Sequence, residues 1–433
     1  MLCLFGTTLS APPAVAEDNV TLDALVTETL RSNPELKFYQ AEIAAAKGER
    51  ITAGAFKNPE AGFEIGRKRA EERGGGLIGE GTAWTVSVSQ SFDFPGRMSL
   101  RKAIANDQIK LSELGLEHFK ASLAARVRIL GYTLYVAQEK ARAAKEVSDR
   151  GSELIKVLVQ RDPAGVAPML ETRIIEGNVI TLNRRSTEAL SEAQKTLFEL
   201  NQLRGKPVSD KLEIASLNLK FSVTPSEDEL VKKAIENNFE LRMRHVEITQ
   251  QGFRVDLSRN ERYPALTVSP YYSEETAGDT ERTVGLGVTV PLPLWDQNTG
   301  AIEVSAARKD QAQTALRLAQ RQVEREVREQ ALSYRLRLSE MARWQPNAVA
   351  QLREAAELGD RHYRLGSLPV STYVELQAQY LEALEAILST QVETLASLSQ
   401  LELLTGTSLY GRSGAAIKTQ GDEVNEETNE KTN

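Results

Sequence analysis

Residues 283–307 read TVGLGVTVPLPLWDQNTGAIEVSAA, and this stretch decides the fold. Its first part alternates Val284, Leu286 and Val288 with small or polar residues, a period of two that is typical of a strand. Pro291 and Pro293 follow, then a polar turn, and then an alanine-rich stretch that predicts a helix of about sixty residues. An ordinary globular domain does not need a strand that runs through two prolines into so long a helix.

The chain contains the same plan twice, about 200 residues apart. The motif Asn33-Pro34-Glu35-Leu36 corresponds to Asn238-Phe239-Glu240-Leu241, and Gly165-x-x-Pro168 corresponds to Gly366-x-x-Pro369. Because these landmarks keep their order, we interpret the chain as two long repeats. The predicted segments are a signal peptide over 1–16, a first repeat over 17–207, a second repeat over 208–407 and a disordered polar tail over 408–433.

Each repeat is predicted to run through a helix, two strands, a long helix, a turn and a returning helix. The first repeat has a helix over 21–55, strands near 61–67 and 82–92, and a helical hairpin over 99–204. The second repeat has a helix over 226–260, strands near 265–272 and 283–290, and a helical hairpin over 301–404. A helix of about 63 residues would be roughly 95 Å long, which exceeds the thickness of a globular domain. The predicted fold class is therefore mainly α with a small β part, in a duplicated helix–hairpin–helix plan.

Composition excludes several classes of protein. A net charge of -7 and a pI near 5.5 argue against a nucleic-acid partner, which would require a basic surface. The one cysteine, Cys3, lies in the predicted signal peptide, whose cleavage site would follow Ala14-Val15-Ala16. No later window approaches 18 uncharged apolar residues, so no transmembrane helix is expected. A protein of this kind that crosses a membrane would do so with strands.

The strands have the alternation of outer membrane strands, with apolar residues on one face and polar residues on the other. An exposed open sheet would aggregate, so closure requires several chains, and three copies would give about twelve strands. The alternative is a soluble antiparallel sheet that caps a helical rod. The residues expected to face lipid are Phe63, Ile65, Trp84, Val86, Val88, Leu266, Val268, Val284, Leu286 and Val288.

Prolines and turn residues mark the joints where strands end and long helices begin. A proline has no N–H to donate, so it ends strand pairing. A polar turn then allows the chain to start the helix. The residues assigned to these joints are Pro95, Gly96, Arg97, Pro291, Pro293, Asp296 and Gly300.

No pattern of residues in the sequence indicates a catalytic, metal-binding or cofactor-binding site. His118, His245 and His362 are scattered without ligand spacing, so no metal site is expected. The loop over 73–81 contains a G-x-G-x-x-G match, but a strand follows it instead of a helix, which indicates a hairpin tip. We therefore expect no enzyme activity and no cofactor.

Two segments carry a resemblance to a known family. Residues 90–97, QSFDFPGR, with Arg101, and residues 290–298, VPLPLWDQN, with Gly300-Ala301-Ile302, resemble TolC-like outer membrane efflux channels. The sharper resemblance is to their cobalt–zinc–cadmium resistance branch, and it covers about residues 20–407. It implies a homotrimer with a twelve-stranded outer membrane β-barrel, continued by a long periplasmic α-helical barrel in a Gram-negative bacterium.

The resemblance also implies a function. Such channels are passive conduits that dock to a periplasmic adaptor protein and, through it, to an inner-membrane pump. Divalent metal cations are the expected cargo, although the pump largely selects what is exported. The alternatives are a drug- or protein-export channel of the same family, and a soluble periplasmic coiled-coil scaffold or adaptor.

At the periplasmic tip, the resemblance implies a gate of acidic residues six and nine positions after the second turn glycine. Thr372 and Glu375 occupy these positions, and the same count in the first repeat reaches Glu171. We expect Glu171 and Glu375 to form acidic rings that favour cations, with solvated helix charges as the alternative. The tip turns that would dock the adaptor contain Gly165, Pro168, Gly366 and Pro369.

Overall fold

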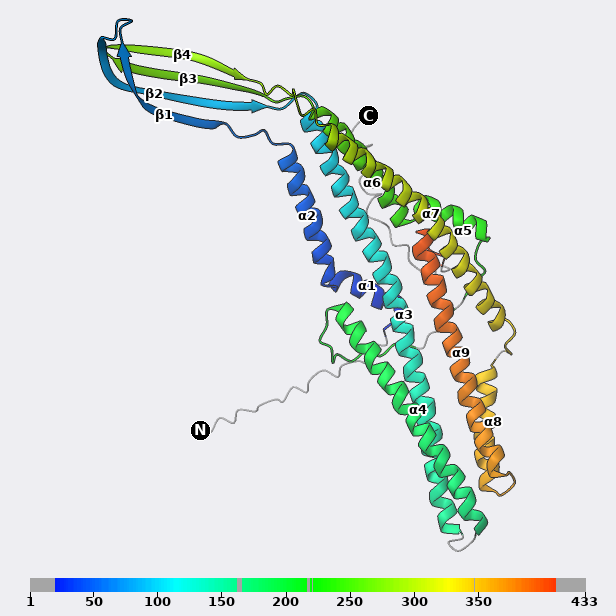
Figure 1. The fold of residues 1–433 in the computed structure, drawn as a ribbon. Helices are drawn as coiled ribbons and strands as arrows, with labels where there is room; N and C mark the ends of the chain where they lie inside the picture. The colour runs from blue at the N-terminus through cyan, green and yellow to red at the C-terminus, as the bar shows by residue number, and fades with distance from the viewer. Residues whose placement is uncertain (1–19, 162–165, 216–218, 220, 346, 410–433) are drawn as a thin grey trace, which may run out of the picture. The chain divides into compact units, whose positions relative to one another are not determined.

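The computed structural model describes residues 20–161, 166–215, 219, 221–345 and 347–409 (Figure 1). The predicted signal peptide, Gly165 and residues 410–433 of the predicted tail lie outside the described residues. The predicted fold class, mainly α with a small β part, is confirmed. The elements are α1 (Leu22–Ser32), α2 (Glu35–Ala53), β1 (Glu60–Glu71), β2 (Leu77–Phe92), α3 (Arg97–Arg161), α4 (Val166–Arg204), α5 (Glu227–Asn237), α6 (Phe239–Asn260), β3 (Leu266–Ala277), β4 (Asp279–Thr289), α7 (Thr299–Met341), α8 (Ala348–Arg364) and α9 (Val370–Thr405).

The chain divides into two compact units, which we describe separately. The sheet unit comprises Glu35–Phe119 and Asn237–Glu324, and it holds α2, the four strands, α6 and the first parts of α3 and α7. The hairpin unit comprises the described parts of Met1–Pro34, Lys120–Glu236 and Arg325–Asn433. It holds α1, α4, α5, α8, α9 and the remaining parts of α3 and α7. No helix in the described part of the chain is long and apolar enough to cross a membrane.

In the sheet unit, the four strands form one antiparallel sheet in the order β1-β2-β3-β4. The strands β2 and β3 come from different repeats, so their pairing joins the repeats in one sheet. A single row across the sheet shows the register: Phe63 pairs with Val86, Val86 with Tyr272, and Tyr272 with Val284. The hairpin tips turn at Gly75 and Gly278, whose positive φ values of 84° and 97° favour glycine.

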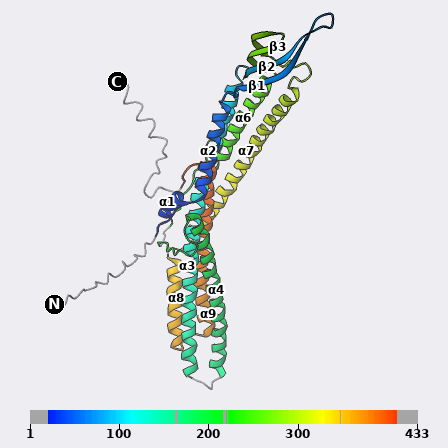
Figure 2. The same ribbon diagram turned by 90° about the vertical axis from the view of Figure 1, so that its left-hand side faces the viewer.

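In the hairpin unit, α3 lies beside α4 and α8 lies beside α9 (Figures 1 and 2). One buried cluster joins both pairs through Leu154, Ile175, Tyr363, Val370 and Tyr373. A second cluster combines alanines with larger side chains, namely Ala143, Val147, Leu182, Ala356, Tyr380 and Leu381. The small alanine side chains allow the helices to approach each other closely.

The first helix of each repeat is split in two, whereas the sequence predicted continuous helices over 21–55 and 226–260. The helix α1 ends at Ser32, because Asn33 precedes Pro34 and takes an extended ψ of 124°. In the second repeat Asn238 has a ψ of 129°, and its side chain accepts hydrogen bonds from the backbone of Glu240 and Leu241. The asparagine that marks the repeat is therefore the residue that separates the two helices.

The second long helix is also interrupted, whereas the sequence predicted one continuous helix over 301–364. The helix α7 ends at Met341 and α8 begins at Ala348, with Asn347 at a positive φ of 65°. The intervening sequence contains Pro346, and a proline inside a helix removes a backbone donor and clashes with the preceding turn. The helix α3, which has no proline, is continuous over 65 residues.

Candidate functional site

The register of the sheet places all ten residues that were predicted to face lipid on one face. These residues alternate along each strand, and the paired rows, such as Phe63 with Val86 and Val268 with Val288, align them across strands. The rings of Trp84 and Tyr272 contact each other on the same face, with centroids 5.3 Å apart. We call this surface the apolar face.

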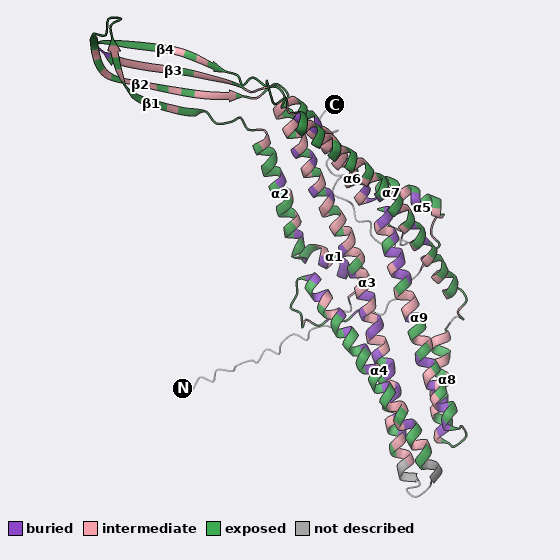
Figure 3. Ribbon diagram, viewed as in Figure 1, coloured by how far each residue is buried: buried purple, intermediate pink, exposed green. Residues whose placement is uncertain are grey.

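The strands consist largely of exposed and half-buried residues (Figure 3), and most side chains of the apolar face are exposed to solvent. Val284 is 82% exposed, Ile65 is 70% exposed and Leu286 is 65% exposed, whereas Trp84 and Val268 are half-buried. Each exposed Å² of apolar surface costs about 25 cal/mol in water relative to an apolar surrounding. A contiguous patch of this kind indicates a contact with lipid or with protein.

The opposite surface, which we call the polar face, carries serine, threonine, glycine and charged residues. The hydroxyl groups of Ser89 and Ser269 lie 2.8 Å apart and share a hydrogen bond between β2 and β3. The ring of Tyr271 covers Gly285, where an added Cβ would lie 2.4 Å from the ring carbon Cζ. The two faces therefore differ in polarity along the parts of the strands nearest the joints, whereas towards the hairpin tips the apolar face also carries charged residues such as Arg67, Arg69 and Arg282.

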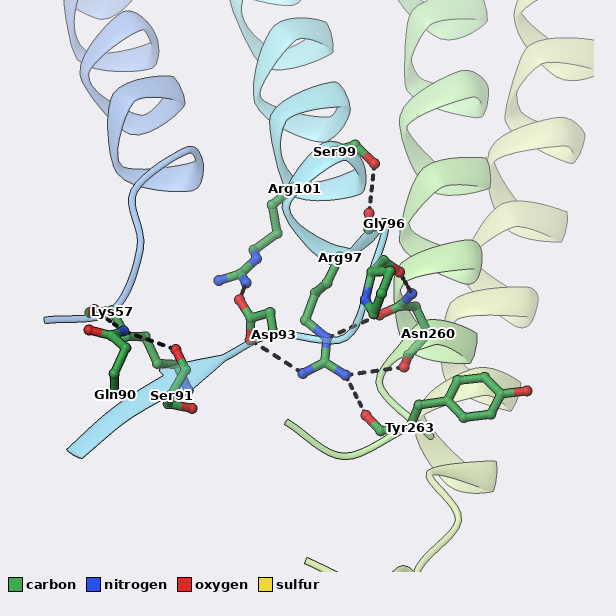
Figure 4. A network of polar contacts seen from close by, with 11 residues as sticks. Lys57, Gln90, Ser91, Asp93, Gly96, Arg97, Ser99, Arg101, Asn260 and Tyr263 are labelled. Carbon is green, nitrogen blue, oxygen red and sulfur yellow. Dashed lines mark hydrogen bonds and ion pairs between the residues drawn. The ribbon is translucent and has the colours of Figure 1, made fainter. Parts of the chain in front are cut away.

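At the joint of the first repeat, Arg97 connects the end of β2 to the end of α6 (Figure 4). Its guanidinium donates to the carbonyl of Tyr263 at 2.6 Å and to the side-chain and backbone oxygens of Asn260 at 3.1 Å each. It also donates to Asp93 at 3.4 Å, and Asp93 accepts a second hydrogen bond from Arg101. The Arg97 side chain is 12% exposed, so these charge-assisted hydrogen bonds are largely shielded from water.

Both joints end in a left-handed residue directly before the long helix. Gly96, with φ +86°, precedes α3, and Asn298, with φ 58°, precedes α7. The Asn298 amide donates to Asp296 at 2.8 Å, and its side chain donates to the carbonyl of Ser258 at 2.7 Å. Gly300, which the sequence assigned to this turn, instead lies in the first turn of α7. The turn therefore depends on Asn298 and Asp296.

The remaining joint residues lie where the strands end. The strand β4 ends at Thr289, so Pro291 and Pro293 follow the last paired residue closely. Pro95 accepts a hydrogen bond from the Asn260 side chain through its carbonyl at 2.9 Å. The rings of Phe94 and Tyr263 stack with centroids 4.5 Å apart, which adds an apolar contact to the Arg97 network.

The tip turn of the second repeat reverses the chain between α8 and α9. Gly366 has φ +74°, and the amides of Gly366 and Ser367 donate to the carbonyls of Tyr363 and His362 at 2.9 Å each. Pro369 is the N-cap of α9. In the first repeat Pro168 lies in α4, while Gly165 lies outside the described residues.

The predicted gate residues Glu171 and Glu375 have different hydrogen-bond partners. The Tyr363 hydroxyl donates to the Glu171 carboxylate at 2.8 Å, which links α8 to α4. Glu375 is exposed on α9 and accepts a hydrogen bond from Gln379 at 2.6 Å, and Thr372 is also exposed. Each acid therefore has its own surroundings within one chain.

Sequence reasoning missed the tyrosines beside Glu171. Tyr363 and Tyr373 stack with centroids 5.2 Å apart in the buried cluster next to the turn. Burial and the hydrogen bond to Glu171 raise the pKa of Tyr363, and burial raises the pKa of Tyr373 to about 12. The only signal in the sequence was the position of Tyr363 three residues before the turn glycine. Over the described residues, no cluster of histidine, cysteine and acidic side chains could hold a metal ion.

Known proteins show what the chain is similar to. Residues 230–407 match the outer membrane efflux protein family. The chain is 25% identical to the cobalt-zinc-cadmium resistance protein CzcC of Cupriavidus metallidurans over 304 residues, which are 70% of this chain and 69% of that protein. The predicted resemblance to outer membrane efflux proteins is confirmed.

Solved structures of outer membrane channels share the fold. The CmeC outer membrane channel of Campylobacter jejuni matches with a TM-score of 0.71 and 17% identity, over 99% of this chain and 97% of that chain. CusC matches with a TM-score of 0.69 and 13% identity, over 92% of this chain and 96% of that chain. The family match begins in α5, so it includes the joint at Pro291 and the tip turn at Gly366.

The joint network predicts a strong effect of Arg97→Ala. The substitution leaves Asp93 and the carbonyls of Asn260 and Tyr263 without their charged donor, so unfolding should become easier by about 2 kcal/mol or more. Thermal unfolding in detergent, followed by circular dichroism, measures the change. Arg259→Ala is the matched control, because Arg259 is 65% exposed and pairs with Asp256 at 3.6 Å. Equal shifts of both variants would contradict the assignment.

The buried tyrosines predict a loss of stability at high pH. Because the folded state raises the pKa of Tyr373 from 10.0 to about 12, the stabilisation is complete below pH 10 and is lost as pH rises through 12. Tyr373→Phe cannot ionise, so its melting temperature should fall less than that of the wild type between pH 8 and pH 11. Tyr263→Phe, at a 51% exposed position, serves as the control. An unchanged pH dependence in Tyr373→Phe would refute this expectation.

Proposed function

We propose that the chain is the outer membrane channel of a tripartite efflux system and acts as a passive conduit that catalyses no reaction. The observation that carries the proposal is the sheet, with an exposed apolar face, a polar face, and β1 and β4 at its edges. Such a sheet matches outer membrane strands, whose side chains alternate between lipid and a water-filled interior. The confirmed family resemblance supports the same conclusion.

Closure of the sheet requires further copies of the chain. In hydrocarbon each unsatisfied backbone group costs several kcal/mol, so the edges of β1 and β4 need partners. Pairing β4 of one copy with β1 of the next removes every edge, and three copies give a barrel of about twelve strands. We therefore assign the chain to a homotrimer in the outer membrane, with the apolar face towards lipid.

The helices would continue the channel through the periplasm. The helix α3 has 65 residues and is roughly 97 Å long at 1.5 Å per residue. The tip turns, including Gly366 and Pro369, would dock a periplasmic adaptor protein that connects the channel to an inner-membrane pump. Residues 1–16 would direct export before their removal.

Divalent metal cations are the proposed cargo. The support is the similarity to CzcC, which is named for cobalt, zinc and cadmium resistance. A conduit needs weak contacts with its cargo, because tight binding would slow conduction. Export of drugs or proteins through the same kind of channel is the alternative, and the specificity of the partner pump distinguishes the two.

A pair of introduced cysteines tests the orientation of the sheet. In a Cys3→Ser background, Thr283→Cys lies on the polar face and Val284→Cys on the apolar face, and both positions are exposed in a single chain. In native outer membranes, a water-soluble maleimide should label Thr283→Cys at least about tenfold faster, because lipid covers the apolar face. Equal labelling, or recovery of the protein in the soluble periplasmic fraction, would favour a soluble scaffold.

Single-channel recording tests the proposed gate. Glu375→Ala should raise the conductance or lower the cation preference in planar bilayers, because it removes a carboxylate proposed to line the tip. Tyr363→Phe should increase conductance as well, since it removes the hydrogen bond that links α8 to Glu171 of α4. Glu188→Ala, on the exposed surface of α4, is the control. If Glu375→Ala and Tyr363→Phe conduct as the wild type and the Glu188→Ala control do, Glu375 and Glu171 have no part in a gate.

A further inference from the structure

The polar face carries an uneven distribution of charge. Within the four strands, Lys68 is the one basic residue on this face. The acidic residues on the same face are Glu60, Glu64, Glu275, Asp279 and Glu281. The polar face is therefore negative, and Lys68 is its one positive charge.

Lys68 contacts two of these acids. Its ammonium nitrogen lies 2.5 Å from Oε2 of Glu275 and 3.2 Å from Oε2 of Glu281. Lys68 belongs to β1, whereas the acids belong to β3 and β4, so the side chain crosses over β2. The crossing is possible because the residues of β2 at this level are Gly81 and Ala83, which pair with Lys68 and Gly66.

The apolar face at the same level is arranged differently. Glu274, the neighbour of Glu275, pairs with Arg282 at 2.8 Å, and Tyr272 donates to the same carboxylate at 3.1 Å. One acid and one base form this pair, so it is neutral. The cluster of Lys68, Glu275 and Glu281 instead combines one base with two acids, and it keeps one negative charge.

We propose that Lys68, Glu275 and Glu281 form a selectivity ring inside the barrel, and that the ring favours hydrated cations. The inference rests on the proposed trimeric channel, which places the polar face around a common axis. Rings of charged side chains set ion preference in channels. In this ring the two carboxylates attract cations, and Lys68 fixes their positions while it offsets part of their charge.

Reversal potentials in planar bilayers under a tenfold KCl gradient test the ring. Lys68→Met should move the reversal potential further in the cation direction, because two carboxylates lose their counter-charge. The double variant Glu275→Gln with Glu281→Gln should lower the K⁺/Cl⁻ permeability ratio by about twofold or more, because Lys68 then dominates the ring. Glu281→Gln alone, which keeps the contact between Lys68 and Glu275, should shift the ratio less in the same direction.

Glu274→Gln is the matched control, because Glu274 is adjacent in sequence and lies on the apolar face. It should leave the reversal potential unchanged. Conducting channels with the same potential in all Lys68, Glu275 and Glu281 variants would overturn the selectivity ring and leave the channel intact. A shift in Glu274→Gln as large as that in the double variant would reverse the assignment of the faces. A wild-type chain that does not conduct would instead overturn the proposed function itself.

Discussion

The requirement that strand edges find hydrogen-bond partners shapes the sheet unit. One chain supplies four strands, and its edges β1 and β4 each expose a row of backbone donors and acceptors. The duplication helps to meet this requirement, because β2 of the first repeat pairs with β3 of the second and brings both hairpins into one sheet. In the proposed trimer, strands from other chains would pair with the outer edges. The apolar face also needs a partner, because the side chains of Val284 and Ile65 are exposed to solvent in the single chain.

The change from strand to helix imposes a second constraint, which the two repeats meet with different residues. A left-handed residue must precede each long helix, and glycine at position 96 adopts this conformation without a steric cost. Asn298 does the same in the second repeat, and its hydrogen bonds to Asp296 and Ser258 compensate for the less favourable backbone. At the first joint, Arg97 also donates hydrogen bonds to the carbonyls of Asn260 and Tyr263, which belong to the second repeat. The start of α3 is therefore attached to the end of α6, although the two segments are far apart in the sequence.

The sequence predicted features that depend on local periodicity, and it missed features that depend on distant partners. The alternation around Val86 and Val284 predicted that these side chains share one face of the sheet, as the register shows, because side-chain direction in a strand follows from position alone. The breaks at Asn238 and near Asn347 had local signals, a capping residue and a nearby proline, that a search for long helices overlooked. In contrast, no local pattern connects Tyr363 to Glu171, which lie 192 residues apart in sequence.

The three acids that we propose to influence conduction, Glu171, Glu275 and Glu281, are held in different ways. In the hairpin unit, a neutral phenol donates to Glu171, so the carboxylate is positioned while its full charge remains. In the sheet unit, the ammonium of Lys68 positions Glu275 and Glu281 and cancels part of their charge. The Tyr363 hydroxyl is protonated at neutral pH, and its raised pKa extends this protonated range to higher pH, so the donor does not become a competing anion. In the proposed cation channel both arrangements would help, because fixed carboxylates attract the ion without closing around it as a binding site would.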